Sequence, residues 1–246
     1  MQTVPIITSA HPSSPRETTP VGAVSLFFWE TTMNDIVEIL TIDGYAVEIF
    51  HDPDGESPRT WCSSTLCIAL RRYNFGGERL SGDAGSCAEA FAWHLAEQGL
   101  HERDIICLPI YMYEHGGIVL KCCPFNDRWD SGQVGFLYER RTDIRREFGV
   151  KRISPKLECR IYDRLRGEIE ALSAWANGDV YGFRIPALDI VCGGYYGWDH
   201  RASGLLEAAT EDIRYAVRQQ RHDHFSRLKR LIRSKVPLQY RPALAF

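Results

Sequence analysis

Two histidines and two aspartates of this sequence stand in polar segments where they could exchange protons with a substrate. His51 and Asp52 are neighbours after an apolar run, whereas His115 lies in a glycine-rich turn. Asp130 follows Trp129 in a third polar segment. A histidine beside a carboxylate can act as a general base, because its unperturbed pKa of about 6.5 lets it hold or release a proton near neutrality. If the protein is an enzyme, the predicted catalytic residues are His51, Asp52, His115 and Asp130, in a hydrolase or phosphodiester-cleaving reaction.

The same polar segments contain residues suited to binding. Arg59 can hold a phosphate or a carboxylate with two parallel hydrogen bonds. Trp129 and Gln133 stand beside Asp130 and complete a predicted binding edge, provided that the neighbouring strands bring these segments together. The alternative is that turn chemistry alone explains these residue types, with Asp52 and Asp130 bonding to backbone N–H groups in their own turns.

The C-terminal part of the chain is strongly basic. Residues 214–241 hold nine basic residues against one acidic residue, a net charge of +8, although the whole chain has a net charge of −3. Arg218, Arg221 and Arg230 are therefore predicted to bind nucleic-acid phosphates or an acidic protein surface. The alternative is a solvated helix face that packs back on the acidic remainder of the same chain.

No cofactor and no metal site are predicted. The eight cysteines include no Cys-x-x-Cys pair, and a chain of this length without a secretion signal is expected to keep its thiols reduced. The glycines of residues 193–197 lack the Lys-Ser/Thr ending of a phosphate-binding loop, and there is no Gly-x-Ser-x-Gly motif. Cys62 or Cys123 could act as a nucleophile with a histidine, but packing in the core is the alternative role.

The composition indicates an ordinary globular protein. Hydrophobic residues make up 44% and charged residues 25% of the 246-residue chain, so a substantial core can be buried. No run of about 18 apolar residues exists, so neither a membrane span nor a membrane partner is expected. Prolines at positions 5, 12 and 15 interrupt the N-terminus where a secretion signal would be apolar, and we expect a cytoplasmic protein.

Strands and helices are predicted around these polar segments. Alternating and β-branched runs predict strands at 36–42, 45–50, 104–112, 118–122, 133–138 and 180–185. Apolar spacing and capping residues predict helices at 88–98, 142–149, 154–177 and 203–234. Asp43-Gly44 predicts a tight hairpin, and residues 193–198 are expected to form a loop. The expected fold is α+β, a single domain with a mainly antiparallel sheet, helices packed on it and a long C-terminal helix.

Three regions are expected along the chain. Residues 1–32 contain four prolines, ten Ser or Thr and only three charges, a composition that cannot offset the entropy of ordering. We predict a disordered extension there and Met33 as the functional start. Residues 33–200 are expected to form the α+β core, and residues 201–246 the basic helix and tail.

Several motifs occur in an order that resembles a known family. They are Glu56-Ser57-Pro58-Arg59, Arg72-Tyr73-Asn74, Leu108-Pro109, Tyr113-Glu114-His115 and Trp129-Asp130-Ser131-Gly132-Gln133-Val134-Gly135-Phe136. The chain is similar, over roughly residues 43–185, to a family of bacteriophage and mobile-element proteins that has no established activity. This resemblance implies a phage accessory gene and does not imply a mechanism.

Two functional hypotheses follow. The leading one is a phage accessory protein in the host cytoplasm that binds a host macromolecule, most readily a host protein, for example as an inhibitor of host defence. Nucleic acid is a second partner class, through the basic C-terminal helix. The alternative is the hydrolase or phosphodiesterase with the histidines and aspartates named above. The sequence does not predict an oligomeric state.

Overall fold

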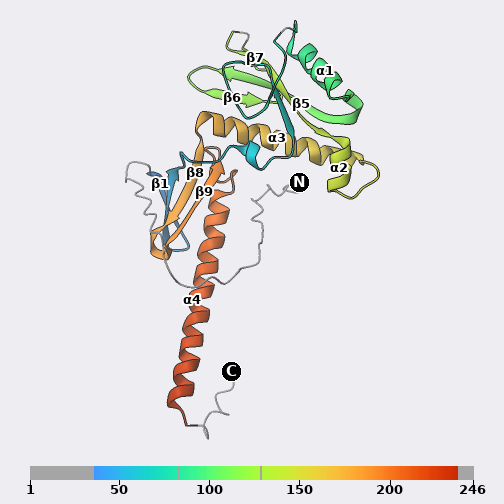
Figure 1. The fold of residues 1–246 in the computed structure, drawn as a ribbon. Helices are drawn as coiled ribbons and strands as arrows, with labels where there is room; N and C mark the ends of the chain where they lie inside the picture. Colours follow the sequence, from blue (N-terminus) through green and yellow to red (C-terminus); the bar gives the residue numbers. More distant parts are fainter. Residues whose placement is uncertain (1–35, 83, 128, 238–246) are drawn as a thin grey trace, which may run out of the picture. The chain divides into compact units, whose positions relative to one another are not determined.

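The computed structural model describes residues 36–82, 84–127 and 129–237 (Figure 1). Within these residues it contains four α-helices and two mostly antiparallel sheets, so the expected α+β class is confirmed. The expected extension at 1–32 and the start at Met33 lie outside the described residues.

The chain divides into two compact units. The described part of unit 1 comprises residues 36–51, 182–192 and 200–237, and unit 2 comprises residues 52–181 and 193–199. This division differs from the expected core at 33–200 followed by a separate basic helix, because the long C-terminal helix belongs to the same unit as the first hairpin.

A four-stranded sheet has the strand order β1-β2-β8-β9. Its strands are β1 (Ile36–Ile42), β2 (Tyr45–His51), β8 (Val180–Ile185) and β9 (Ile190–Tyr196). Asp43 and Gly44 have φ angles of 49° and 84°, as a two-residue hairpin with the favoured twist requires. The predicted hairpin is therefore confirmed. The loop expected at 193–198 is wrong over residues 193–196, because β9 continues to Tyr196 and is followed by Gly197.

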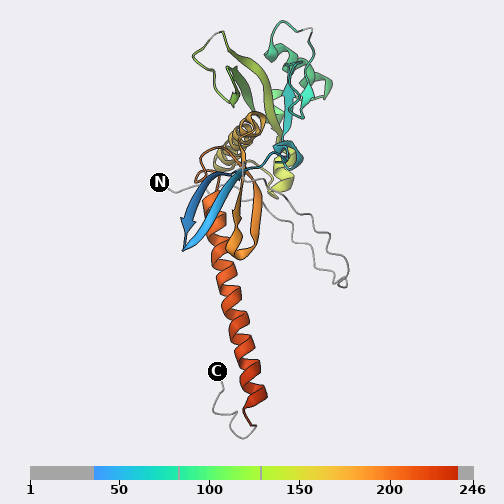
Figure 2. The ribbon, with the colours of Figure 1, turned by 90° about the vertical axis from the view of Figure 1, so that its left-hand side faces the viewer.

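Helix α4 (Leu205–Lys235) begins beside this sheet and extends beyond it (Figures 1 and 2). Its first turns bury Leu205, Ala209 and Ile213, which recur every four residues and therefore lie on one side of the helix. A guanidinium nitrogen of Arg214 lies 3.5 Å from a carboxylate oxygen of Asp43 in the β1–β2 turn. The buried residues anchor the first part of α4 in unit 1.

Unit 2 contains a five-stranded sheet with the order β4-β3-β7-β5-β6. Its strands are β3 (Thr65–Ile68), β4 (Glu78–Arg79), β5 (Ile105–Glu114), β6 (Ile118–Lys121) and β7 (Ser131–Arg140). The pairs are antiparallel except β3–β4. The predicted hairpin between β5 and β6 is confirmed.

Helices cover both faces of this second sheet. The α-helices of unit 2 are α1 (Cys87–Glu97), α2 (Arg141–Glu147) and α3 (Pro155–Asn177). Unit 2 also contains the short 3-10 turns η2 (Pro58–Thr60) and η3 (Glu102–Asp104), whereas the turn η4 (Pro186–Leu188) belongs to unit 1. The Ser154 hydroxyl accepts a hydrogen bond from the Leu157 N–H, and Gly178 ends α3 at a φ of 81°, as predicted from capping chemistry. The expected cap of α2 at Thr142 is wrong, because Arg140 occupies the cap position without a side-chain bond.

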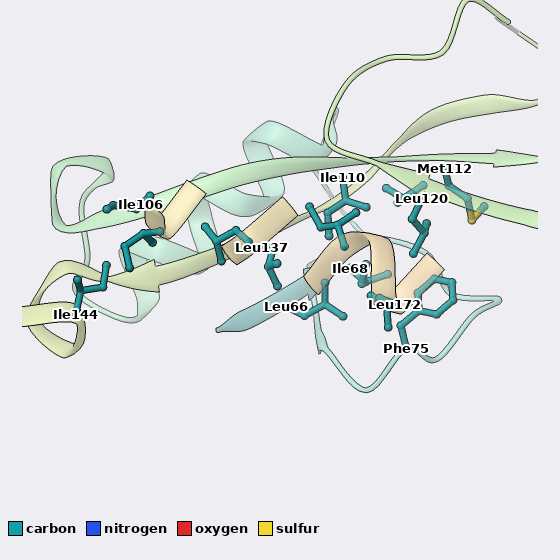
Figure 3. Packing of buried hydrophobic residues seen from close by; sticks show 14 of the residues in the cluster. Leu66, Ile68, Phe75, Ile106, Ile110, Met112, Leu120, Leu137, Ile144 and Leu172 are labelled. Atoms are coloured by element: carbon teal, nitrogen blue, oxygen red, sulfur yellow. The ribbon is translucent and has the colours of Figure 1, made fainter. Parts of the chain in front are cut away.

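Alternate residues of the strands of unit 2 form two apolar layers. Leu66, Leu137 and Ile106 pack on the side of α3, where Leu172 also points (Figure 3). Cys67 and Tyr138 face the other side and pack with Phe91 of α1. Since successive strand residues point to opposite faces, one sheet carries both layers.

Candidate functional site

Two of the four predicted catalytic residues lie in contact at the tip of the β5–β6 hairpin. Nδ1 of His115 lies 3.0 Å from a carboxylate oxygen of Asp130, whose segment leads into β7. Gly116 takes a φ of 72° in the turn, which favours glycine. The imidazole is 73% exposed. A carboxylate at Nδ1 orients the ring and leaves Nε2 as the nitrogen that can exchange a proton.

Asp127 fixes the position of this contact, and sequence reasoning missed it. One of its carboxylate oxygens accepts hydrogen bonds from the backbone N–H groups of Trp129, at 2.7 Å, and Asp130, at 3.1 Å. These bonds are the main cause that lowers the pKa of Asp127 below its ordinary value of 3.8. An aspartate two residues before the Trp-Asp pair is typical of such a side-chain turn, and this spacing was the available signal.

The two predicted binding residues of this segment differ in exposure. Trp129 is 95% exposed. Gln133 is half-buried and lies opposite Tyr111 in the β5–β7 pair. Tyr113 stacks on the ring of His115, with 6.2 Å between the ring centroids. The tip therefore presents one open aromatic side chain, Trp129, beside the His115–Asp130 pair, and Gln133 lies in the strand that follows.

Asp52 is engaged in a different arrangement. Its carboxylate accepts a hydrogen bond from the Gly194 N–H at 2.9 Å, although the two residues are 142 positions apart. A Cβ at Gly193 would lie 2.4 Å from the same carboxylate, so a larger residue there would displace the Asp52 side chain. Asp52 thus joins the end of β9 to the segment after β2, instead of bonding within its own turn. His51 ends β2 and belongs to unit 1, whereas Asp52, His115 and Asp130 belong to unit 2.

Arg59 lies largely inside unit 2, with 12% of its side chain exposed. Its guanidinium donates to the Ser64 hydroxyl at 3.1 Å and to the Ser64 carbonyl. It also lies 3.5 Å from a carboxylate oxygen of Glu168, and the Ser64 hydroxyl donates to that same oxygen. The predicted anion-binding arginine therefore binds a carboxylate of its own chain.

A second buried ion pair adjoins this one. Arg164 stands one helical turn before Glu168 on α3 and donates to the buried carboxylate of Glu139 and, at 2.7 Å, to Glu147. Burial is the main cause that raises the pKa of Glu139 above its ordinary value of 4.5, and Arg164 opposes that rise. Within the described chain, Nε of Arg59, Nε of Arg164 and Oε1 of Glu139 are buried without a hydrogen-bond partner. This is a costly network, since each unpaired buried polar atom destabilises the fold.

Cys62 does not have the properties of an activated nucleophile. Burial, followed by the nearby carboxylate of Glu168, raises the pKa of its thiol to about 12. A thiol becomes nucleophilic as the thiolate, so Cys62 is nearly all in the unreactive form at neutral pH. Cys123 is exposed. No group of three or more His, Cys, Asp or Glu residues that could hold a metal ion occurs in the described part of the chain.

The predicted basic residues Arg218, Arg221 and Arg230 are all exposed on α4. From residue 218 to residue 235, every side chain of the helix except Ser226 is exposed. We call this segment the distal α4 surface. It also carries four exposed apolar side chains, which are between 37% and 61% accessible: Phe225, Leu228, Leu231 and Ile232.

A shallow hollow of about 500 Å³ lies where α4 passes the first hairpin. Asp43 and Tyr45 line it from the hairpin, and Ile213 and Val217 line it from the helix. Arginines of α4 complete its wall: Arg214, Arg218 and Arg221. The hollow therefore continues into the distal α4 surface and shares its positive charge.

None of the described helices combines the length and the apolar character needed to cross a membrane. The chain matches no protein-family model, no curated protein and no solved structure. The likeness to bacteriophage proteins therefore remains an expectation.

Proposed function

We propose that the protein is a binding protein that docks an acidic partner protein on the distal α4 surface. The observation that carries the proposal is a row of apolar side chains, flanked by arginines and lysines, on a helix segment that extends beyond its own sheet. The expected phage origin supplies the setting: an accessory protein whose partner is a host protein, for example a component of host defence.

The apolar row fits recognition of a helix by a groove. Phe225 and Leu228 are three positions apart, Ile232 follows four positions later, and this spacing aligns them on one side of the helix. Helices that dock in protein grooves use anchors with this spacing. Burying one such side chain contributes about 1.5–3 kcal/mol, so leaving several in water is unfavourable unless a partner covers them.

The charge on the helix selects the chemistry of the partner. Residues 214–235 carry eight basic residues and one acidic residue. An acidic surface around the groove of the partner attracts this basic segment and speeds association. A basic surface would be repelled, so the charge also disfavours wrong partners. Two copies of the distal α4 surface would repel each other, so self-pairing through this segment is disfavoured.

The pattern fits a protein groove better than a phosphate backbone or a lipid surface. Phosphate contacts would use the arginines but would leave Phe225 and Leu228 in water. A helix lying in a lipid surface needs a wide apolar face along its length. Here Arg221 and Lys235 lie on the same side as Leu228, seven residues before and after it, and restrict the apolar area to about two turns.

The experiment is capture from a bacterial lysate with the full chain as bait, followed by purification of the captured protein. We expect that protein to be acidic and to bind at least about tenfold more weakly when Phe225 and Leu228 are changed to alanine. Charge reversal of Arg218, Arg221 and Arg230 to glutamate should weaken binding similarly, and raised salt should weaken wild-type binding.

A matched control tests whether the apolar row is specific. Tyr215 is exposed on the same helix, on the side away from Leu228, so Tyr215→Ala should leave affinity unchanged. Duplex DNA and anionic vesicles serve as alternative probes. Binding of either probe that needs the arginines but is indifferent to Phe225→Ala would replace the protein partner with that ligand.

The hydrolase or phosphodiesterase alternative retains one supporting observation, the 3.0 Å contact between His115 and Asp130. Its test is hydrolysis of a chromogenic phosphodiester, with His115→Ala and Asp130→Asn as variants. Turnover that falls at least 100-fold in both variants would favour the enzyme. Equal turnover in wild type and variants would exclude a catalytic role of this pair.

A further inference from the structure

Among the strands that the structure describes, β1 is an edge strand of the four-stranded sheet. Its neighbour is β2, and the strand order ends at β1. Among the described residues, none donates to or accepts from the other side of the strand. An edge strand with unpaired backbone groups is a template for pairing with another chain.

The hairpin geometry identifies the backbone groups that point to this open side. In a two-residue hairpin the residues that flank the loop, here Ile42 and Tyr45, form a hydrogen-bonded pair. Two positions away, Leu40 and Val47 repeat that arrangement. The backbone N–H and C=O groups of Thr41, which lies between these positions, and of Ile39, on the other side of Leu40, therefore point away from β2.

Proteins usually protect edge strands from pairing with other chains by means of prolines, charged side chains or bulges, and β1 has few of these features. Its seven residues contain no proline and one charge, Glu38. Val37 and Ile39 leave 48% and 61% of their surface in water. The register shift between Ile36 and Glu38 disturbs one end of the strand, and the part from Glu38 to Ile42 is regular. The regular part is the segment that can accept a further strand.

The regular part of β1 is complementary to itself in the antiparallel direction. With a two-fold axis at Leu40, Ile39 lies opposite Thr41 of the partner subunit, and both residue types are β-branched and suited to strand pairs. Leu40 lies opposite the partner subunit's Leu40, and Glu38 lies opposite an isoleucine. No like charges face each other.

We propose that two copies of this chain associate through their β1 strands, which gives one continuous eight-stranded antiparallel sheet. Such an interface is isologous and closes as a dimer. The other edge strand, β9, is less suited, because Gly194 at a φ of 82° interrupts its regular edge. The contact area is small, so we expect a dissociation constant on the order of micromolar.

Sedimentation of the full chain across a concentration series tests the dimer. Ile39→Lys places a charge at the open edge and should raise the dimer dissociation constant at least about tenfold. Val191→Lys on β9 is the matched control, since Val191 is 63% exposed and Ile39 61%, and should leave the constant unchanged. A monomer at all concentrations, or a dimer equally weakened by both variants, overturns the proposal.

Cross-linking tests the register. Residues opposite each other in a non-hydrogen-bonded antiparallel pair have Cα atoms about 4.5 Å apart, within the range of a disulfide. Leu40→Cys should therefore yield a covalent dimer on mild oxidation, whereas Ile42→Cys, four residues from its own copy in this register, should not. Cross-linking at neither position, with the wild-type chain as background, overturns the register and the proposal.

A shortened chain that starts at Met33 tests whether β1 pairs with a second copy or with residues 1–32 of its own chain. If residues 1–32 of the same chain cover β1, the full chain remains a monomer and the shortened chain dimerises. That outcome overturns the proposal. Equal dissociation constants for both chains, sensitive to Ile39→Lys, support it.

Discussion

The hydroxyl of Ser64 donates a hydrogen bond to the carboxylate of Glu168, although 104 residues separate them in the chain. Both side chains are buried, and Arg59 contacts both. The bond ties the segment after η2 to the middle of α3. It also explains why a carboxylate is tolerated inside unit 2: the hydroxyl and the guanidinium replace the water that the carboxylate loses on burial.

Removing Arg59 should destabilise unit 2 strongly. Arg59→Ala leaves Glu168 buried without its cation, and loss of one partner of a buried ion pair costs about 3–5 kcal/mol. Denaturant unfolding measures this. Arg166→Ala, which removes an exposed pair with Asp163, is the control and should cost less than about 1 kcal/mol. Equal losses would contradict a buried role for Arg59.

Glu139 should make stability depend on pH. Its pKa is raised in the folded protein, chiefly by burial, so the folded state holds its proton to higher pH than the unfolded state. The contribution of Glu139 to the free energy of unfolding is complete below about pH 4.5 and is lost as pH rises through the raised pKa. Glu139→Gln should remove this loss of stability with rising pH. Glu147→Gln, at an exposed partner of Arg164, should retain it. Melting temperatures between pH 4 and 8 provide the comparison.

Two isoleucines of α4 should differ sharply in their effect on stability. Ile213 is 1% exposed and Ile232 is 37% exposed. Ile213→Ala removes a packed side chain and should cost about 2–5 kcal/mol. Ile232→Ala should change the free energy of unfolding by less than about 0.5 kcal/mol. A large loss at Ile232 would mean that the distal α4 surface is covered within the free protein.

The cysteines should differ in their rate of alkylation. Because burial and Glu168 raise the pKa of Cys62 to about 12, its thiolate is scarce at pH 8. Cys123 is exposed and should be modified by iodoacetamide before Cys62, which peptide mass spectrometry can follow. Both should react at similar rates in denaturant. Modification of Cys62 before Cys123 in the native protein would contradict this burial.

Asp127 should hold the tip of unit 2 in place. Asp127→Ala removes the acceptor of the Trp129 and Asp130 N–H groups, so their amide hydrogens should exchange faster. Because the pKa of Asp127 is lowered, its contribution to stability is present above about pH 3.8 and is lost as pH falls through the lowered pKa. Exchange measured by NMR at neutral pH tests the first effect. Unchanged exchange at both amides would show that other contacts hold the turn.

Features that depend on neighbouring residues could be predicted from the sequence. Asp43-Gly44 predicts its hairpin because few residues adopt positive φ at both turn positions. Ser154, Pro155 and Gly178 predict the ends of α3, because capping satisfies backbone groups within one turn of the helix. A meeting of polar segments at one sheet edge is expected only if their strands are neighbours, and of the predicted catalytic residues the structure brings His115 and Asp130 into contact.

Other features depend on residues far apart in the chain, and the sequence alone could not decide them. The sequence predicts a loop at residues 193–194, because a strand with glycines is recognised only from its partners, here β8 and the carboxylate of Asp52. Arg59 had the chemistry to bind an external anion, and only the position of Glu168 on α3 shows which carboxylate it holds. Local chemistry is determined by the amino-acid sequence because its partners lie within a few residues, whereas the partners of a strand or a buried charge exist only once the chain has folded.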